Sequence, residues 1–184
     1  MPRYDISDFP RRSHIDIAHE AAITAYGKAG TWLDSRTRVK ILEEVRSAKD
    51  CPLCLEQRRS LSPYAKEGEH VSQTGLDPIT VEIVHRLCNN ADRLTYRWFE
   101  SILAQGVSAE QYVEIVGLVA TAIIIDGFAG ALGYQTIPAP RAQGGVPTRK
   151  ANDKVVEAGA WIPIMDVENE ATEIGLPKIP NIFR

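Results

Sequence analysis

The sequence lacks the features that mark several large classes of protein. It has only three cysteines, too few and too unevenly placed for a secreted disulfide scaffold. Neither sign of charge dominates, because the net charge is only -3, so we expect neither a nucleic acid nor an anionic membrane as a partner. The first residues contain no apolar stretch of the secretory-signal kind. We therefore expect a cytoplasmic protein in a reducing compartment.

The chain also has no long apolar run that is free of charge. Its most apolar segment, VEIVGLVATAIIIDGFAGALG, contains Glu114 and Asp126 and is interrupted by glycines. We interpret this segment as a buried core helix rather than a membrane span. No glycine-rich phosphate loop follows a strand pattern, so no organic cofactor is expected.

What the chain does contain is the composition of a globular domain, with 44% hydrophobic and 24% charged residues. Helical patterns fill most of its length, and no alternating strand pattern is convincing. Six of the eleven prolines lie in the last fifty residues, which indicates an extended tail. We predict one all-α domain over residues 1–184, with a helical core over about 13–133 and a tail over 134–184.

Capping residues mark where the expected helices begin. The longest helix runs for roughly 25 residues to Gly133 and starts at a capping box made by Ser108 and Gln111. The expected caps of the earlier helices are Ser13, Asp34 or Ser35, Asp50 and Asp77.

Two cysteines stand at an expected helix start, in the stretch DCPLCLEQR. Cys51 and Cys54 are one turn apart, close enough for a disulfide, and a helix N-terminus favours the thiolate. Arg58, four residues after Cys54, shares its helix face and would stabilise a thiolate or an anionic substrate without acting as a base. The pair is either a redox-active dithiol or two small buried residues.

The later stretch LTYRWFESILAQGVSAEQYVEIVGLVATAIIIDGFAGALG, taken with the CxxC, resembles the alkylhydroperoxidase D-like branch of the carboxymuconolactone decarboxylase superfamily. The resemblance covers roughly residues 30–135. It implies an all-helical homo-oligomer that reduces a small hydroperoxide and is regenerated by an external thiol reductant. It also implies that Cys54 attacks the peroxide and that Cys51 resolves the product.

The chain departs from the family pattern Glu-x11-Cys-x2-Cys-x3-His at both ends. Val39 stands at the glutamate position and Arg58 at the histidine position, so the proton relay is missing from its expected places. Glu43, one turn beyond Val39, and His85, with a suitable intrinsic pKa, are the candidates to replace it. The predicted catalytic residues are Cys54, Cys51, Arg58, Glu43 and His85.

Two other functions remain open. The first is a non-enzymatic helical scaffold with structural or zinc-binding cysteines, in which Cys51, Cys54, His85 and Cys88 would be the ligands. Because the gap between these two pairs is long for a zinc module, we expect no metal site. The second is a carboxymuconolactone decarboxylase-like enzyme that acts on a small organic acid through His85 and arginines.

The carboxylate of Asp126 needs a partner inside its apolar helix. His85, an arginine or helix-end N–H groups could provide one. A structural ion pair that fixes helix docking is the first interpretation. In the second, Asp126 and His85 line a pocket below the dithiol and accept its proton.

Overall fold

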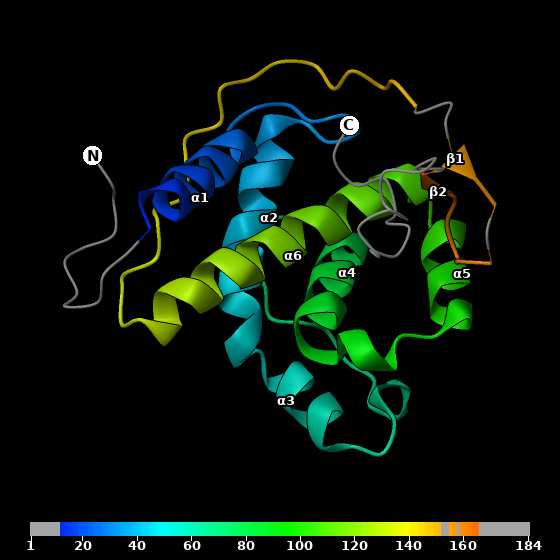
Figure 1. The fold of residues 1–184 in the computed structure, drawn as a ribbon. Helices are drawn as coiled ribbons and strands as arrows, with labels where there is room; N and C mark the ends of the chain where they lie inside the picture. The colour runs from blue at the N-terminus through cyan, green and yellow to red at the C-terminus, as the bar shows by residue number, and fades with distance from the viewer. Residues whose placement is uncertain (1–11, 152–154, 158, 166–184) are drawn as a thin grey trace.

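The computed structural model describes residues 12–151, 155–157 and 159–165. The fold is all-α, as the sequence predicts (Figure 1). The helices are α1 (Ser13–Tyr26), α2 (Ser35–Ser47), α3 (Pro52–Arg59), α4 (Pro78–Asn90), α5 (Tyr96–Ala104) and α6 (Ala109–Ala131). Single 3-10 turns lie at Ala48–Asp50, Pro63–Ala65 and Ala91–Arg93.

Most of the predicted helix starts are confirmed by their hydrogen bonds. Asp34 accepts from the N–H of Thr37, Asp77 caps α4 in the same way, and the Ser108–Gln111 capping box opens α6. The prediction for α3 is wrong, since its N-cap is Cys51 itself while Asp50 ends the preceding 3-10 turn.

The first helix also differs from the prediction at its start. Ser13 is its first residue rather than its cap, and the preceding Arg12 makes no side-chain capping bond. Neither difference changes the order of the helices or their packing.

Helix α6 forms the centre of the core. It crosses both α2 and α4, and α1 packs at its C-terminal half (Figure 1). By length and composition α6 could also span a membrane, but the core helix of a soluble protein can have the same length and composition. Half of the most apolar 18-residue stretch of α6 is buried inside this structure. The inward side chains of α6 are Tyr112, Ile115, Leu118, Val119, Ala122, Ile125 and Ala129.

The chain beyond α6 returns across the molecule as extended backbone (Figure 1). Its backbone bonds to the segment between α1 and α2, where Gln143 donates to Gly27 and Arg149 donates to Thr31. The strands β1 (Val155–Val156) and β2 (Ile164–Met165) pair antiparallel. Between them, Trp161 stacks on Phe99 of α5 with ring centroids 6.0 Å apart, so this part of the tail covers apolar surface of its own chain.

Candidate functional site

The CxxC pair lies inside the molecule, where α3 begins. Cys51 is 2% exposed and Cys54 is fully buried, and both are free thiols. Pro52 occupies the first turn of α3, where its missing N–H costs nothing. The two sulfurs therefore face the interior rather than the solvent.

Two histidines from different segments meet these sulfurs. His70, in the loop between α3 and α4, places Nδ1 3.5 Å from the Cys51 sulfur and 3.4 Å from the Cys54 sulfur. His85, in the middle of α4, places Nδ1 3.2 Å from the Cys54 sulfur. The two imidazole rings are neighbours, with centroids 4.3 Å apart. The pair of thiols is thus in contact with a pair of histidines.

Each histidine turns its other nitrogen toward a carboxylate. His70 Nε2 lies 2.7 Å from Glu82 of α4, and His85 Nε2 lies 2.7 Å from Glu44 of α2. Glu44 is fully buried and also accepts hydrogen bonds from the hydroxyls of Ser72 and Thr74. These bonds hold both imidazoles so that Nδ1 faces sulfur.

Glu82 is further held by a buried arginine and a tryptophan. The side chain of Arg86 donates to Glu82 over 2.8 Å, and the indole N–H of Trp98 donates over 3.1 Å. Burial alone would raise the pKa of Glu82, but the hydrogen bonds from His70 and Arg86 lower it to about 2. Glu82 is therefore an anion at neutral pH.

The two histidines differ in basicity. Burial would lower the pKa of His70, but the hydrogen bonds to Glu82 and Cys51 and the charges of these two groups together raise it above the usual value. Burial lowers the pKa of His85, and the nearby charge of His70 lowers it further against the influence of Glu44. Of the two histidines, His70 is thus the one that holds a second proton more readily, and His85 the one that loses it more readily.

The two thiols differ in the same way. Burial would raise the pKa of Cys51, but hydrogen bonds from the Cys54 backbone N–H, from His70 and from the Val71 backbone lower it. Burial raises the pKa of Cys54, and the charge on Cys51 raises it further. Of the two thiols, Cys51, the N-cap of α3, is therefore the one that ionises more readily.

Of the five predicted catalytic residues, the structure brings together Cys51, Cys54 and His85. Glu43 is exposed, and its neighbour Glu44 is the carboxylate that reaches the site. Arg58 lies on the exposed side of α3 and donates to Asn89. Within the described part of the chain, no hydrogen bond or ion pair joins Arg58 to either sulfur.

Sequence reasoning missed His70, Glu82 and the position of Glu44. His70 lies in a polar loop without periodicity, and its partner Glu82 is twelve residues away on α4. The spacing of Glu82 and Arg86, four residues apart on one helix, was the available signal for a paired carboxylate.

Asp126 belongs to a different part of the fold. It accepts two hydrogen bonds from Arg46 of α2, at 2.8 and 2.9 Å, and Arg46 also bonds to the carbonyl of Ile137. Asp126 therefore joins α6 to α2 and the tail. The suggestion that it lines a pocket with His85 is wrong, whereas the structural ion pair is confirmed.

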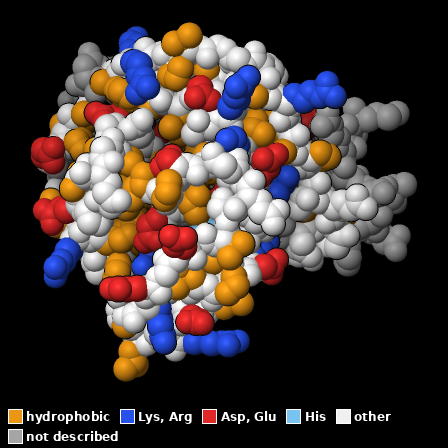
Figure 2. Space-filling view, turned by 180° about the vertical axis from the view of Figure 1, so that it is seen from behind, with side chains coloured by type: hydrophobic (Ala, Val, Ile, Leu, Met, Phe, Trp, Pro, Cys, Tyr) orange, Lys and Arg blue, Asp and Glu red, His pale blue; other side chains and the backbone are white. Residues whose placement is uncertain are grey.

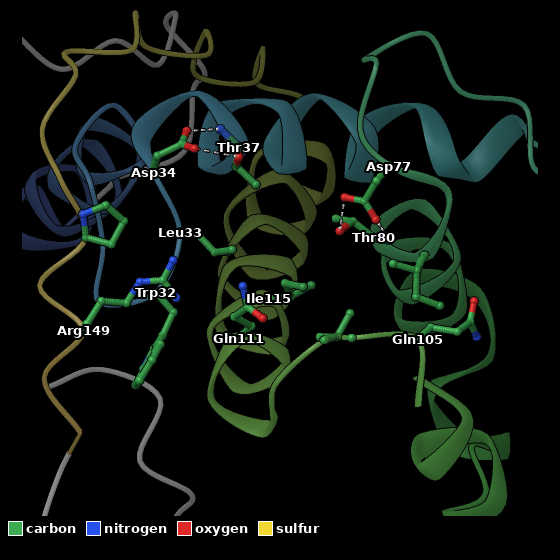
Figure 3. A pocket seen from close by; sticks show the side chains of 14 residues that line it. Trp32, Leu33, Asp34, Thr37, Asp77, Thr80, Gln105, Gln111, Ile115 and Arg149 are labelled. Atoms are coloured by element: carbon green, nitrogen blue, oxygen red, sulfur yellow. Dashed lines mark hydrogen bonds between the residues drawn. The ribbon is translucent and has the colours of Figure 1, made fainter. Parts of the chain in front are cut away.

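A pocket of about 460 Å³ lies elsewhere, between the starts of α2 and α4 (Figure 3). Asp34 and Asp77 line it, but each is engaged in capping its own helix. Arg149 lies over the ring of Trp32 on the side of the tail, 5.4 Å from its centroid. None of the thiols or histidines of the buried cluster lines this pocket.

The surface offers no field of a single charge on the face seen from behind. There, acidic and basic side chains are interspersed with apolar ones (Figure 2).

Comparisons with protein-family models, with curated proteins and with solved structures found no match to this chain. The buried cluster of two thiols, two histidines and two carboxylates therefore has to be understood from its own geometry.

Proposed function

We propose that the protein is a thiol-dependent oxidoreductase that reduces a small hydroperoxide through a dithiol–disulfide cycle at Cys51 and Cys54. The observation that supports this proposal is that both thiols contact an imidazole whose far nitrogen is bonded to a carboxylate. Proteins use such thiol–imidazole–carboxylate hydrogen-bond networks to activate nucleophiles and to transfer protons. On this proposal the chain is an alkylhydroperoxidase D-like protein with a relocated proton relay.

The resting charges follow from the hydrogen bonds. Cys51 is a thiolate beside the His70 imidazolium, which Glu82 stabilises. Cys54 is a thiol, and its proton faces Nδ1 of neutral His85. The Nε2–H of His85 donates a hydrogen bond to Glu44 in this tautomer. This arrangement favours Cys51 as the attacking thiol, the reverse of the order that the family resemblance implies.

In the first step, the Cys51 thiolate attacks one oxygen of the hydroperoxide, and the O–O bond breaks. Sulfur becomes a sulfenic acid and the leaving alkoxide takes a proton from the His70 imidazolium, which gives one alcohol. The histidine that holds the proton at rest is therefore the one that donates it.

In the second step, His85 accepts the proton of Cys54. The new thiolate attacks the Cys51 sulfur, an S–S bond forms, and the departing hydroxide leaves as water after protonation by His85. An external dithiol or two equivalents of a monothiol then reduce the disulfide. Because the cycle needs a reducing compartment, we place the protein in the cytoplasm.

The burial of both sulfurs limits the substrate. With Cys51 2% exposed, a peroxide must enter the interior to reach the thiolate. Hydrogen peroxide and small alkyl hydroperoxides fit this condition better than bulky lipid hydroperoxides do.

Rapid-quench trapping of sulfenic acid tests the proposal on metal-free protein. After one equivalent of hydroperoxide, Cys54→Ser should accumulate a sulfenic acid at Cys51, and wild type should form the Cys51–Cys54 disulfide. Cys88→Ser is the matched control and should behave as wild type. Sulfenic acid in Cys51→Ser but not in Cys54→Ser would restore the opposite order, and oxidation of neither thiol would refute the peroxidase function.

A further inference from the structure

The four inner groups of the cluster also form a complete set of metal ligands. The two sulfurs and the ligating nitrogens of His70 and His85 all lie within 4.8 Å of one another. They come from the start of α3, from the loop after it and from α4. We propose that the reduced protein binds one Zn²⁺ ion through Cys51, Cys54, His70 and His85.

The distances between these atoms suit a tetrahedral ion. With Zn–S of about 2.3 Å and Zn–N of about 2.0–2.1 Å, a sulfur and a nitrogen ligand are separated by about 3.5 Å. Three of the four sulfur–nitrogen distances in the cluster are 3.2, 3.4 and 3.5 Å, and the fourth, between Cys51 and His85, is within 4.8 Å. An ion could therefore enter with small movements of the side chains.

The carboxylates complete the pattern expected around zinc-binding histidines. A ligating histidine usually donates its other N–H to a carboxylate, which fixes the tautomer and the ring orientation. Glu82 is placed to accept from His70 and Glu44 to accept from His85, each over 2.7 Å. Once His70 releases its Nδ1 proton to the incoming ion's displaced water, the lone pairs of both Nδ1 atoms are directed toward the sulfurs.

Charge and burial fit a closed four-ligand site. Two thiolates balance the charge of Zn²⁺, so the ion and its ligands can be buried together without net charge. The side chains of His70 and His85 are 5% and 0% exposed, and the cysteines are similarly buried. No fourth position is left open to solvent, which is typical of sites that stabilise a fold.

This set differs from the one that the sequence suggested, because His70 replaces Cys88. Cys88 is absent from the cluster, although His85 stands three residues before it on α4. An ion there would connect the loop that carries His70 to both α3 and α4. It would also exclude the disulfide, since the same two sulfurs serve both.

The inference does not depend on peroxide reduction, because it requires only that the thiols be reduced. Full-length protein is treated with a phosphine reductant, stripped of metal with a chelator, and titrated with Zn²⁺ against a chromophoric competitor. One equivalent should bind. Co²⁺ in place of Zn²⁺ should give thiolate charge-transfer bands and the intense visible bands of a tetrahedral ion.

Variants identify the ligands. His70→Ala and Cys51→Ser should each weaken Zn²⁺ binding by at least about 10-fold, and Glu82→Gln by about 10- to 100-fold through the loss of support for His70. Cys88→Ser should bind as wild type. Circular dichroism of each apo variant checks folding, and the Co²⁺ spectrum of wild type decides the matter if a variant does not fold.

Two results would overturn the site. One is wild-type reduced protein that takes up no stoichiometric Zn²⁺, and the other is binding that is weakened by Cys88→Ser but not by His70→Ala. Peroxide reduction is assayed separately in the presence of chelator. Failure of the zinc site therefore leaves the peroxidase function testable, and the reverse also holds.

Discussion

At the scale of single residues, the site depends on which of two adjacent glutamates faces the core. Neighbouring residues on a helix point about 100° apart, so Glu43 and Glu44 face different surroundings. Glu44 is fully buried and bonded to Ser72, Thr74 and His85, whereas Glu43 is exposed. The sequence shows that an acidic residue is available on α2, but the inward one depends on the packing of α2 against α4.

We expect Glu44→Gln to destabilise the protein by about 2 kcal/mol, because the amide puts an N–H₂ group among donors that now bond to a carboxylate. Glu43→Gln is the matched control and should change the free energy of unfolding by less than about 0.5 kcal/mol. Urea denaturation of the two variants with chelator present measures the difference. Equal effects of both changes would show that Glu44 does not make the buried contacts.

The reactivity of the three cysteines should follow the order of their pKa values. In metal-free protein, the Cys51 thiol in Cys54→Ser should be alkylated with a pKa below that of a free cysteine, since hydrogen bonds lower the pKa of Cys51. Burial raises the pKa of Cys88 to about 12 and raises that of Cys54 as well, so both should react more slowly than Cys51 near neutral pH. Alkylation rates between pH 5 and 10, measured by mass spectrometry, test this order. A Cys51 that titrates like Cys88 would remove the thiolate from the proposed mechanism.

The histidine of the loop shows the limit of sequence reasoning at this scale. The CxxC motif and His85 stand in recognisable helical patterns, and both were predicted as site residues. His70 lies in a loop whose sequence has no hydrophobic periodicity, so the sequence does not show which way its side chain points. Only the path of that loop, held where Ser72 and Thr74 bond to Glu44, brings His70 to the sulfurs.

At the scale of the elements, local sequence signals were enough to predict the helices but not the contacts between them. The caps at Asp34, Asp77 and Ser108 act within four residues, so they can be read from the chain. The partner of Asp126 is Arg46, eighty residues earlier, and no local pattern predicts that pairing. The sequence indicates that the buried carboxylate of Asp126 needs a partner, but it does not identify that partner.

Asp126→Asn should lower the free energy of unfolding by about 2 kcal/mol, because it leaves the Arg46 guanidinium without its counter-charge. The Arg46 side chain is 23% exposed, so contact with water reduces the size of this effect. Asp92→Asn, at an exposed position, should have little effect. Thermal or urea unfolding measures both. Because Arg46 and Asp126 do not contact the thiols, thiol reactivity should be unchanged in the folded variant.

At the scale of the whole molecule, α6 is apolar on its outer side as well as its inner side. Ile124 is 65% exposed and Ile123 is 43% exposed, although the helix forms the centre of the core. Glycine and alanine surround them, which would allow another helix to approach closely. We call this surface the α6 outer face, and its exposed residues are Ala120, Ile123, Ile124, Gly127, Gly130 and Ala131.

We predict that the protein is a homo-oligomer whose subunits meet through the α6 outer face, since a contiguous exposed apolar surface marks an interaction site. The mass from light scattering at micromolar concentration should exceed the 20.4 kDa of one chain. Ile124→Lys should reduce it to the monomer mass by placing a charge in the interface, with little change in the stability of the subunit because the position is exposed. Leu61→Lys, at a fully exposed apolar residue that lies after α3, is the control and should leave the mass unchanged. A wild-type protein with monomer mass would exclude the oligomer, and an Ile124→Lys variant that stays assembled would place the interface elsewhere.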